Sequence, residues 1–205
     1  MIRRPPRSTQ GVSSAASDVY KRQGYVDAIM HEARLAAGLN HPNIATVYDF
    51  KVEGDYACIV MEYFPGSLDR EMSDTGPMPP SRVSDLAIQI CAALEFAHSK
   101  EIIHRDIKPS NILIGRDNHY KIADFGSTPN ESKLVYMAPE QKYGSLIDAR
   151  TDIFSVGAVL YQMITGLPFP TTVISPEYYI PGVLANTINK CFTGCIEKIN
   201  ASSFL

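Results

Sequence analysis

The segment IIHRDIKPSNILI, residues 102–114, places His, Arg, Asp, Lys and Asn within eight positions between two hydrophobic runs. Asp106, Lys108 and Asn111 lie at positions i, i+2 and i+5 of a loop that a proline interrupts. This spacing can direct all three side chains toward one point. The segment therefore indicates a site where a carboxylate, an ammonium group and an amide act together.

A second carboxylate, Asp124, follows thirteen positions after Asn111 in the segment IADFG, residues 122–126. Phosphoryl transfer requires a carboxylate to orient the nucleophile and accept its proton, a cation for the phosphate and oxygen ligands for Mg²⁺. Mg²⁺ prefers carboxylate and amide oxygens. One base, one cation and two metal ligands are thus present, which indicates phosphoryl-transfer chemistry.

The rest of the sequence predicts a small part with strands, followed by a larger and mainly helical part. Runs rich in β-branched and aromatic residues at 44–52 and 56–64, separated by EGD, predict an antiparallel hairpin. Short strands are expected at ILIG and YKIAD, on either side of RDNH. Apolar residues at helical spacing predict helices over 25–38, 81–100, 152–165 and 183–199. Two such parts would enclose a cleft, which is a common place for a ligand site.

Composition excludes several classes of function. The 205 residues are 45% hydrophobic and 20% charged, a globular balance, and the net charge of -3 offers no basic surplus for nucleic acid or an anionic membrane surface. The longest apolar stretch, residues 153–166, is too short to span a bilayer. The four cysteines lack metal-binding spacing, which is typical of free thiols in a reducing compartment. We expect no nucleic-acid partner, no membrane segment in this chain and a cytoplasmic location.

With these motifs the chain resembles the eukaryotic-type serine/threonine protein kinases. The matching segments are HEARLAAGLNHPNI at 31–44, HRDIKPSN at 104–111, DFG at 124–126, APE at 138–140 and DIFSVG at 152–157. They occur in the order and approximate spacing of that family, from about Tyr25 to the C-terminus. The resemblance implies an α+β, bilobal kinase-like fold with a partial β-rich N-lobe over 24–64 and a mainly helical C-lobe over 65–205.

The resemblance also implies catalytic and metal-binding roles. Asp106 would be the catalytic base, and Lys108 would neutralise the transferring phosphate. Asn111 and Asp124 would hold Mg²⁺. In the same comparison His104 and Phe125 would stack in the interior, and Asp152 would brace the catalytic loop from below.

A further set of residues would bind ATP, according to the same resemblance. Glu32 would pair with the ATP-binding lysine, and Met61 would gate the back of the nucleotide pocket. The backbone of Glu62 and Phe64 would bond adenine, and Leu113 would pack beneath it. The implied partners are the nucleotide and a protein substrate.

The first 23 residues depart from the rest. They are polar and rich in Arg and Ser, which fits a transit peptide or a disordered tail, but they resemble more closely a translated sequencing adapter. The family covers the phosphates with a G-x-G-x-x-G loop, yet no two of the thirteen glycines here are closer than nine positions. Lys21 lies only eleven positions before Glu32, too near to be the ATP-binding lysine. We therefore expect an N-terminally truncated domain.

Two further departures lie closer to the site. Only eleven residues separate DFG from APE, and Lys133 stands where the family usually has a threonine. Glu140 usually pairs with a buried arginine, but the aligned position here is Ile199.

Two functions stay open. One is a serine/threonine kinase that transfers the γ-phosphate of ATP, with this chain an inactive fragment. The alternative is a pseudokinase scaffold that binds partners without catalysis.

Overall fold

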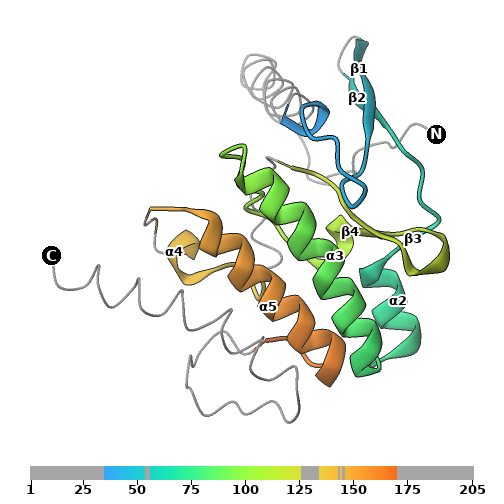
Figure 1. The fold of residues 1–205 in the computed structure, drawn as a ribbon, viewed down its shortest axis with the longest axis vertical. Helices are drawn as coiled ribbons and strands as arrows, with labels where there is room; N and C mark the ends of the chain where they lie inside the picture. Colours follow the sequence, from blue (N-terminus) through green and yellow to red (C-terminus); the bar gives the residue numbers. More distant parts are fainter. Residues whose placement is uncertain (1–34, 54–55, 126–133, 143, 145, 170–205) are drawn as a thin grey trace, which may run out of the picture.

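The computed structural model describes residues 35–53, 56–125, 134–142, 144 and 146–169. Figure 1 shows a hairpin of strands β1 (Val47–Glu53) and β2 (Tyr56–Met61) at one end of the molecule. Helices α3 (Pro80–His98) and α5 (Ala149–Thr165) pack side by side in the larger part. This α+β arrangement of a small strand-bearing part and a helical part is the predicted fold class.

Strands β1 and β2 form the antiparallel hairpin that the sequence predicts. The register pairs Val47 with Met61 and Glu53 with Tyr56, with an irregularity between Val47 and Asp49. Just before β1, Ala45 N–H donates to the carbonyl of Ile122 at 2.8 Å. The segment that leads into the hairpin is therefore bonded directly to Ile122 in the larger part.

A second sheet has the order β3–β4–β5, with β3 at Gly66–Ser67, β4 at Ile112–Ile114 and β5 at Tyr120–Ile122. Both pairings are antiparallel. Strands β4 and β5 are those predicted from the sequence. Strand β3 and the following helix α2 (Leu68–Thr75) are additional, and α2 buries a single residue, Leu68.

The main core lies between α3, α5 and the second sheet. Helix α3 begins with a proline, whose fixed φ suits the first turn, and α5 begins at the N-cap Asp148. Helix α5 ends at Gly166, where φ is 71° and an added Cβ would lie 3.1 Å from Pro77 Cγ. Both helices supply apolar side chains that are fully buried, among them Val83, Leu86, Ile90, Leu94, Ala158, Val159 and Met163.

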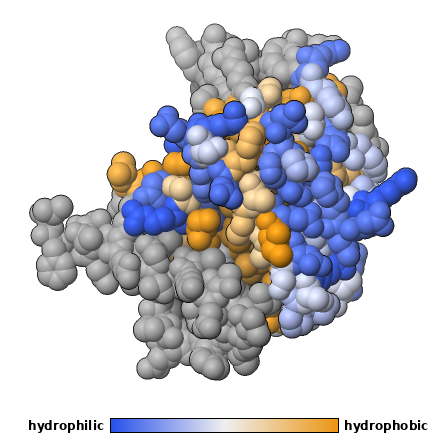
Figure 2. Space-filling model, viewed as in Figure 1, coloured by the Kyte–Doolittle hydropathy of each residue, from blue (hydrophilic) through white to orange (hydrophobic). Residues whose placement is uncertain are grey.

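Shorter elements complete the described part. They are the single-turn 3-10 helices η1 (Pro109–Asn111) and η2 (Arg116–Asn118), and the short helix α4 (Pro139–Lys142). Figure 2 shows polar and charged residues over much of one face, with a hydrophobic band across its middle. Within the described ranges, no helix combines the length and apolar character needed to cross a membrane.

Candidate functional site

The loop that carries Asp106 is held from beneath by one carboxylate. Asp152, at the start of α5, is fully buried and accepts hydrogen bonds from the backbone N–H groups of His104 and Arg105, both at 2.8 Å. His98 Nε2 donates to the same carboxylate at 2.7 Å. Arg105 has a φ of 70°, a conformation that non-glycine residues rarely adopt. The buried carboxylate therefore fixes the backbone immediately before Asp106.

The three polar residues of the loop do converge. Lys108 Nζ donates to the carboxylate of Asp106. The amide nitrogen of Asn111, which is 4% exposed, donates to the carbonyl of Asp106 at 2.9 Å and to its Oδ2 at 3.3 Å. The i, i+2, i+5 spacing thus brings one carboxylate, one ammonium group and one amide into direct contact.

Asp124 is brought to this group through the backbone. Ala123 N–H donates to the carbonyl of Asn111 at 2.9 Å, so Asp124 follows directly after a residue bonded to the loop. His104 Nε2 donates to the carbonyl of Ala123 at 2.9 Å. Asp124 has a φ of 66°, which turns the chain sharply at this position. The backbone bond between Ala123 and Asn111 therefore brings the position of Asp124 next to the loop that carries Asn111.

The ring of Phe125 packs against His104, with the ring centroids 4.5 Å apart. Both side chains are buried, at 1% and 0% exposure respectively. This ring contact between His104 and Phe125 is the one that the resemblance in sequence implied. It joins the segment after Asp124 to the loop before Asp106, so the two carboxylates belong to one packed unit.

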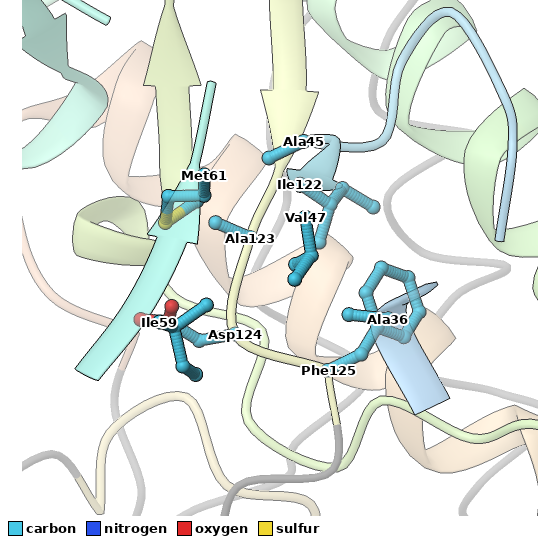
Figure 3. Close-up of a pocket in the computed structure, with 9 residues that line it drawn as sticks. All are labelled: Ala36, Ala45, Val47, Ile59, Met61, Ile122, Ala123, Asp124 and Phe125. Carbon is cyan, nitrogen blue, oxygen red and sulfur yellow. The ribbon is translucent and has the colours of Figure 1, made fainter. Parts of the chain in front are cut away.

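A small pocket of about 20 Å³, partly open to solvent, lies between the hairpin and this unit. Figure 3 shows Ile59 and Met61 of β2 opposite Ala123 and Asp124, with Phe125 beside Ala36. Its lining is apolar except for the carboxylate of Asp124. The recess therefore combines apolar side chains from the hairpin with one carboxylate from the segment after β5.

The residues predicted to contact adenine also gather on one side of this pocket. Leu113 packs with Ala45 and Ala123, and Met61 and Phe64 pack against that small cluster. Glu62 N–H donates to the carbonyl of Thr46 at 2.9 Å, so this N–H group is already engaged within the protein.

One ion pair near these residues was not predicted from the sequence. Lys121 on β5 is 8% exposed, and its Nζ lies 2.7 Å from Glu62 Oε2. Burial acts to raise the pKa of Glu62, but the hydrogen bond and the charge of Lys121, together with bonds from Thr46, outweigh burial. The pKa of Glu62 therefore lies below its ordinary value. The only sequence signal was a charged residue in an otherwise apolar strand.

The residues around APE form a second polar contact with α5. Tyr136 is buried, and its hydroxyl donates to the side chain of Gln162. Burial, followed by the charge of Asp69, raises the pKa of Tyr136 to about 12, although the bond with Gln162 acts in the opposite direction. The phenol is therefore neutral throughout the physiological pH range.

Several predicted residues lie outside the described part of the chain, namely Glu32, Lys133 and Ile199. Glu140 is described and is 2% exposed, with Oε1 accepting from Thr151 at 2.7 Å. Its Oε2 is buried without a hydrogen-bond partner among the described residues. The buried carboxylate is thus satisfied at one oxygen by those residues.

The donor set fits Mg²⁺ better than a transition metal. Among the described residues, no group of three or more His, Cys, Asp and Glu side chains is placed to hold a metal ion. Mg²⁺ needs only one or two protein oxygens, because it keeps waters and binds substrate phosphates. The amide nitrogen of Asn111 donates to Asp106, so the ligand atom that this side chain would offer a metal ion is its oxygen.

Comparison with known proteins places the chain in a family. The family described as protein kinase domain matches residues 12–180. The serine/threonine-protein kinase PknB of Mycobacterium leprae is 38% identical over 170 residues, covering 74% of this chain and 27% of that protein. A probable serine/threonine-protein kinase of Clostridium acetobutylicum is 36% identical over 200 residues, covering 85% and 30%.

A third relative, the serine/threonine-protein kinase pkn2 of Myxococcus xanthus, is 34% identical over 171 residues and is covered over 21% of its length. The chain therefore spans between about a fifth and a third of these relatives. The family match begins inside the first 23 residues. Their resemblance to a sequencing adapter stays a prediction.

Proposed function

We propose, from the premise that this chain belongs to the protein kinase domain family, that it carries the catalytic site of a serine/threonine protein kinase. The substrates would be ATP and the hydroxyl groups of proteins, in the cytoplasm, where ATP is available. The observation that carries this proposal is the contact of Asp106 with Lys108 and Asn111, next to Asp124.

The proposed reaction forms a bond between a serine or threonine oxygen and the γ-phosphorus and breaks the bond to ADP. Asp106 would orient the hydroxyl and accept its proton. Lys108, whose ammonium group is held beside that carboxylate, would place positive charge near the transferring phosphate. Asn111 and Asp124 would hold Mg²⁺, which supplies charge neutralisation of the phosphates when bound.

The pocket between the hairpin and Asp124 would receive the nucleotide. Leu113 and Met61 offer the apolar surface expected around adenine, and the backbone of Glu62 and Phe64 would supply its hydrogen bonds. Glu32 is proposed as the partner of an ATP-binding lysine that the family places upstream. These assignments place adenine at one side of the pocket and the phosphates near Asp124.

For the 205-residue chain itself we propose very weak phosphoryl transfer or none. The sequence contains no G-x-G-x-x-G loop to cover the phosphates. Positioning supplies most of the rate in this chemistry, so an uncovered phosphate would react slowly. Robust transfer to a protein substrate, abolished by Asp106→Asn, would contradict this part of the proposal.

The alternative is a pseudokinase scaffold. The unpartnered oxygen of Glu140 among the described residues favours it, as does the segment of eleven residues between DFG and APE. The intact contacts of Asp106 and Asn111 favour the kinase.

A nucleotide titration with and without Mg²⁺ separates the two functions. A fluorescent ADP analogue would be bound to the full chain, to Asp124→Asn and to Asp85→Asn, a control at an exposed position of α3. The kinase proposal predicts that Mg²⁺ tightens binding in the wild type and the control. Asp124→Asn should lose about tenfold or more of that effect, as expected for a damaged metal site. A wild-type chain whose nucleotide binding is absent or indifferent to Mg²⁺ would favour the scaffold.

A further inference from the structure

The ion pair between Lys121 and Glu62 joins two segments of the proposed nucleotide site. The lysine side chain is 11% exposed and the glutamate side chain 30% exposed, with 2.7 Å between Nζ and Oε2. A buried ammonium group without a partner is unfavourable, so Lys121 depends on this carboxylate. Because the lysine end of the pair is largely removed from solvent, the pair is screened less than an ion pair between two exposed side chains.

Lys121 lies on the face of the sheet that would support adenine. In the ladder between β4 and β5 it is directly opposite Leu113, and directly opposed residues project to the same face. Ala123, two positions further along, has the same orientation and packs with Leu113. Lys121 therefore lies on the same face of the sheet as the apolar cluster of Leu113 and Ala123, on the side of the residues that follow β2.

The carboxylate of Glu62 connects three parts of the chain. Besides Lys121, its Oε2 accepts from Thr46 N–H at 3.4 Å, while Glu62 N–H donates to the carbonyl of Thr46 at 2.9 Å. Lys121 Nζ also lies 5.8 Å from the ring centroid of Phe64. The connecting segment, defined as residues 61–64, is thus attached to Lys121 of β5 by one ion pair, through Glu62, and by one cation–ring contact, through Phe64.

We propose that Lys121 is a positioning residue that holds the connecting segment against β5, at a fixed distance from Asp124. The inference rests on the proposed function for its consequence, because the connecting segment would bond adenine while Asp124 would hold Mg²⁺. Lys121 lies on β5, and Asp124 follows two positions after that strand ends. Loss of the ion pair would release the adenine side of the site and leave the metal side in place.

Two measurements on the full chain test this. Amide hydrogen exchange reports the local opening of the connecting segment without any ligand. Titration with ADP, with and without Mg²⁺, reports nucleotide affinity and the Mg²⁺ effect separately. The variants are Lys121→Met, Lys121→Arg and the double variant Lys121→Met with Glu62→Gln. The matched control is Lys100→Met, because Lys100 also lies over a phenylalanine ring, at 5.2 Å from Phe96, but is exposed on the surface.

Lys121→Met should speed exchange at Glu62 and Phe64 by about tenfold, the size of effect expected when one hydrogen bond to a charged group is lost. Exchange in α5 should not change. ADP affinity should fall by a similar factor while the enhancement by Mg²⁺ persists. Lys121→Arg should restore both properties, and Glu62→Gln should partly relieve the effect of Lys121→Met by removing the unpaired carboxylate.

Three results would contradict either the positioning role of Lys121 or the proposed kinase function. If Lys121→Met behaves like Lys100→Met, or if exchange rises equally in α5, the positioning role is wrong. If exchange rises only in the connecting segment but no variant, including the wild type, binds ADP, the positioning role stands and the proposed kinase function fails. If ADP affinity and the Mg²⁺ effect fall together, the lysine acts on the whole site, and the inference is overturned.

Discussion

The backbone around the two carboxylates is bent at positions where a side chain usually prevents it. Arg105 and Asp124 have φ values of 70° and 66°, and such conformations cost of order 1–3 kcal/mol each. Asp152 bonds the first bend, and the bond between Ala123 and Asn111 borders the second. The sequence motifs identified the side chains, but the left-handed conformations became visible only in the structure.

Replacement of Asp152 by alanine should destabilise the chain by at least ~3 kcal/mol, because the backbone N–H groups of His104 and Arg105 and the ring of His98 would lose their acceptor. Urea unfolding at constant m-value would measure this. Asp85→Ala, at an exposed position of α3, is the control. A loss below about 1 kcal/mol, the net value of one ordinary hydrogen bond, would show that the carboxylate does not support the loop.

Because the pKa of Tyr136 is raised in the folded chain, the free energy of unfolding should depend on pH in the alkaline range. Its pKa in the folded chain is about 12, against an ordinary value of 10.0, chiefly because the phenol is desolvated. The unfolded chain loses this proton first as pH rises, so the contribution to stability is complete below about pH 10 and disappears toward about pH 12. The free energy of unfolding should therefore fall more steeply over this range in the wild type than in Tyr136→Phe. Equal slopes for the two proteins would refute the assignment.

At the scale of elements, strongly patterned segments were predictable and weakly patterned ones were not. Helices α3 and α5 occur where apolar periodicity placed them, because each buries a continuous face, and the β1–β2 hairpin occurs where runs of β-branched and aromatic residues predicted it. Helix α2 has only eight residues and buries only Leu68, so its pattern is too short to be recognised from the sequence. Strand β3 is two residues long and is defined by its pairing with β4, a contact distant in sequence.

Asp148 should contribute to the stability of α5 as its N-cap. Its side chain accepts from Arg150 N–H at 2.9 Å. Asp148→Ala should lower the free energy of unfolding by about 1 kcal/mol, whereas Asp148→Asn should retain most of it, because asparagine is an equally good N-cap. Thermal unfolding of both variants would compare them. An alanine variant as stable as the wild type would mean that tertiary packing alone fixes the start of this helix.

At the scale of the whole molecule, Met61 and Asp124 are the predicted site residues that line the pocket, while Asp106, Lys108 and Asn111 contact one another within one loop. The exception to sequence reasoning is the Lys121–Glu62 pair, whose members are 59 positions apart. A single lysine in a strand is usually solvated, so its burial depends on the fold around it. Motif spacing can predict groups that act within one loop, while contacts between distant segments require the structure.

The most direct test of the proposed site is to locate the bound metal ion. Mn²⁺, added with ADP in place of Mg²⁺, should broaden the NMR signals of residues adjoining Asn111 and Asp124, such as Ile112 and Ala123, and leave Met163 in the core sharp. Asp124→Asn should remove the broadening. Broadening centred on the exposed acidic residues of α2, or unchanged in Asp124→Asn, would contradict the assignment of these residues to a metal-nucleotide site.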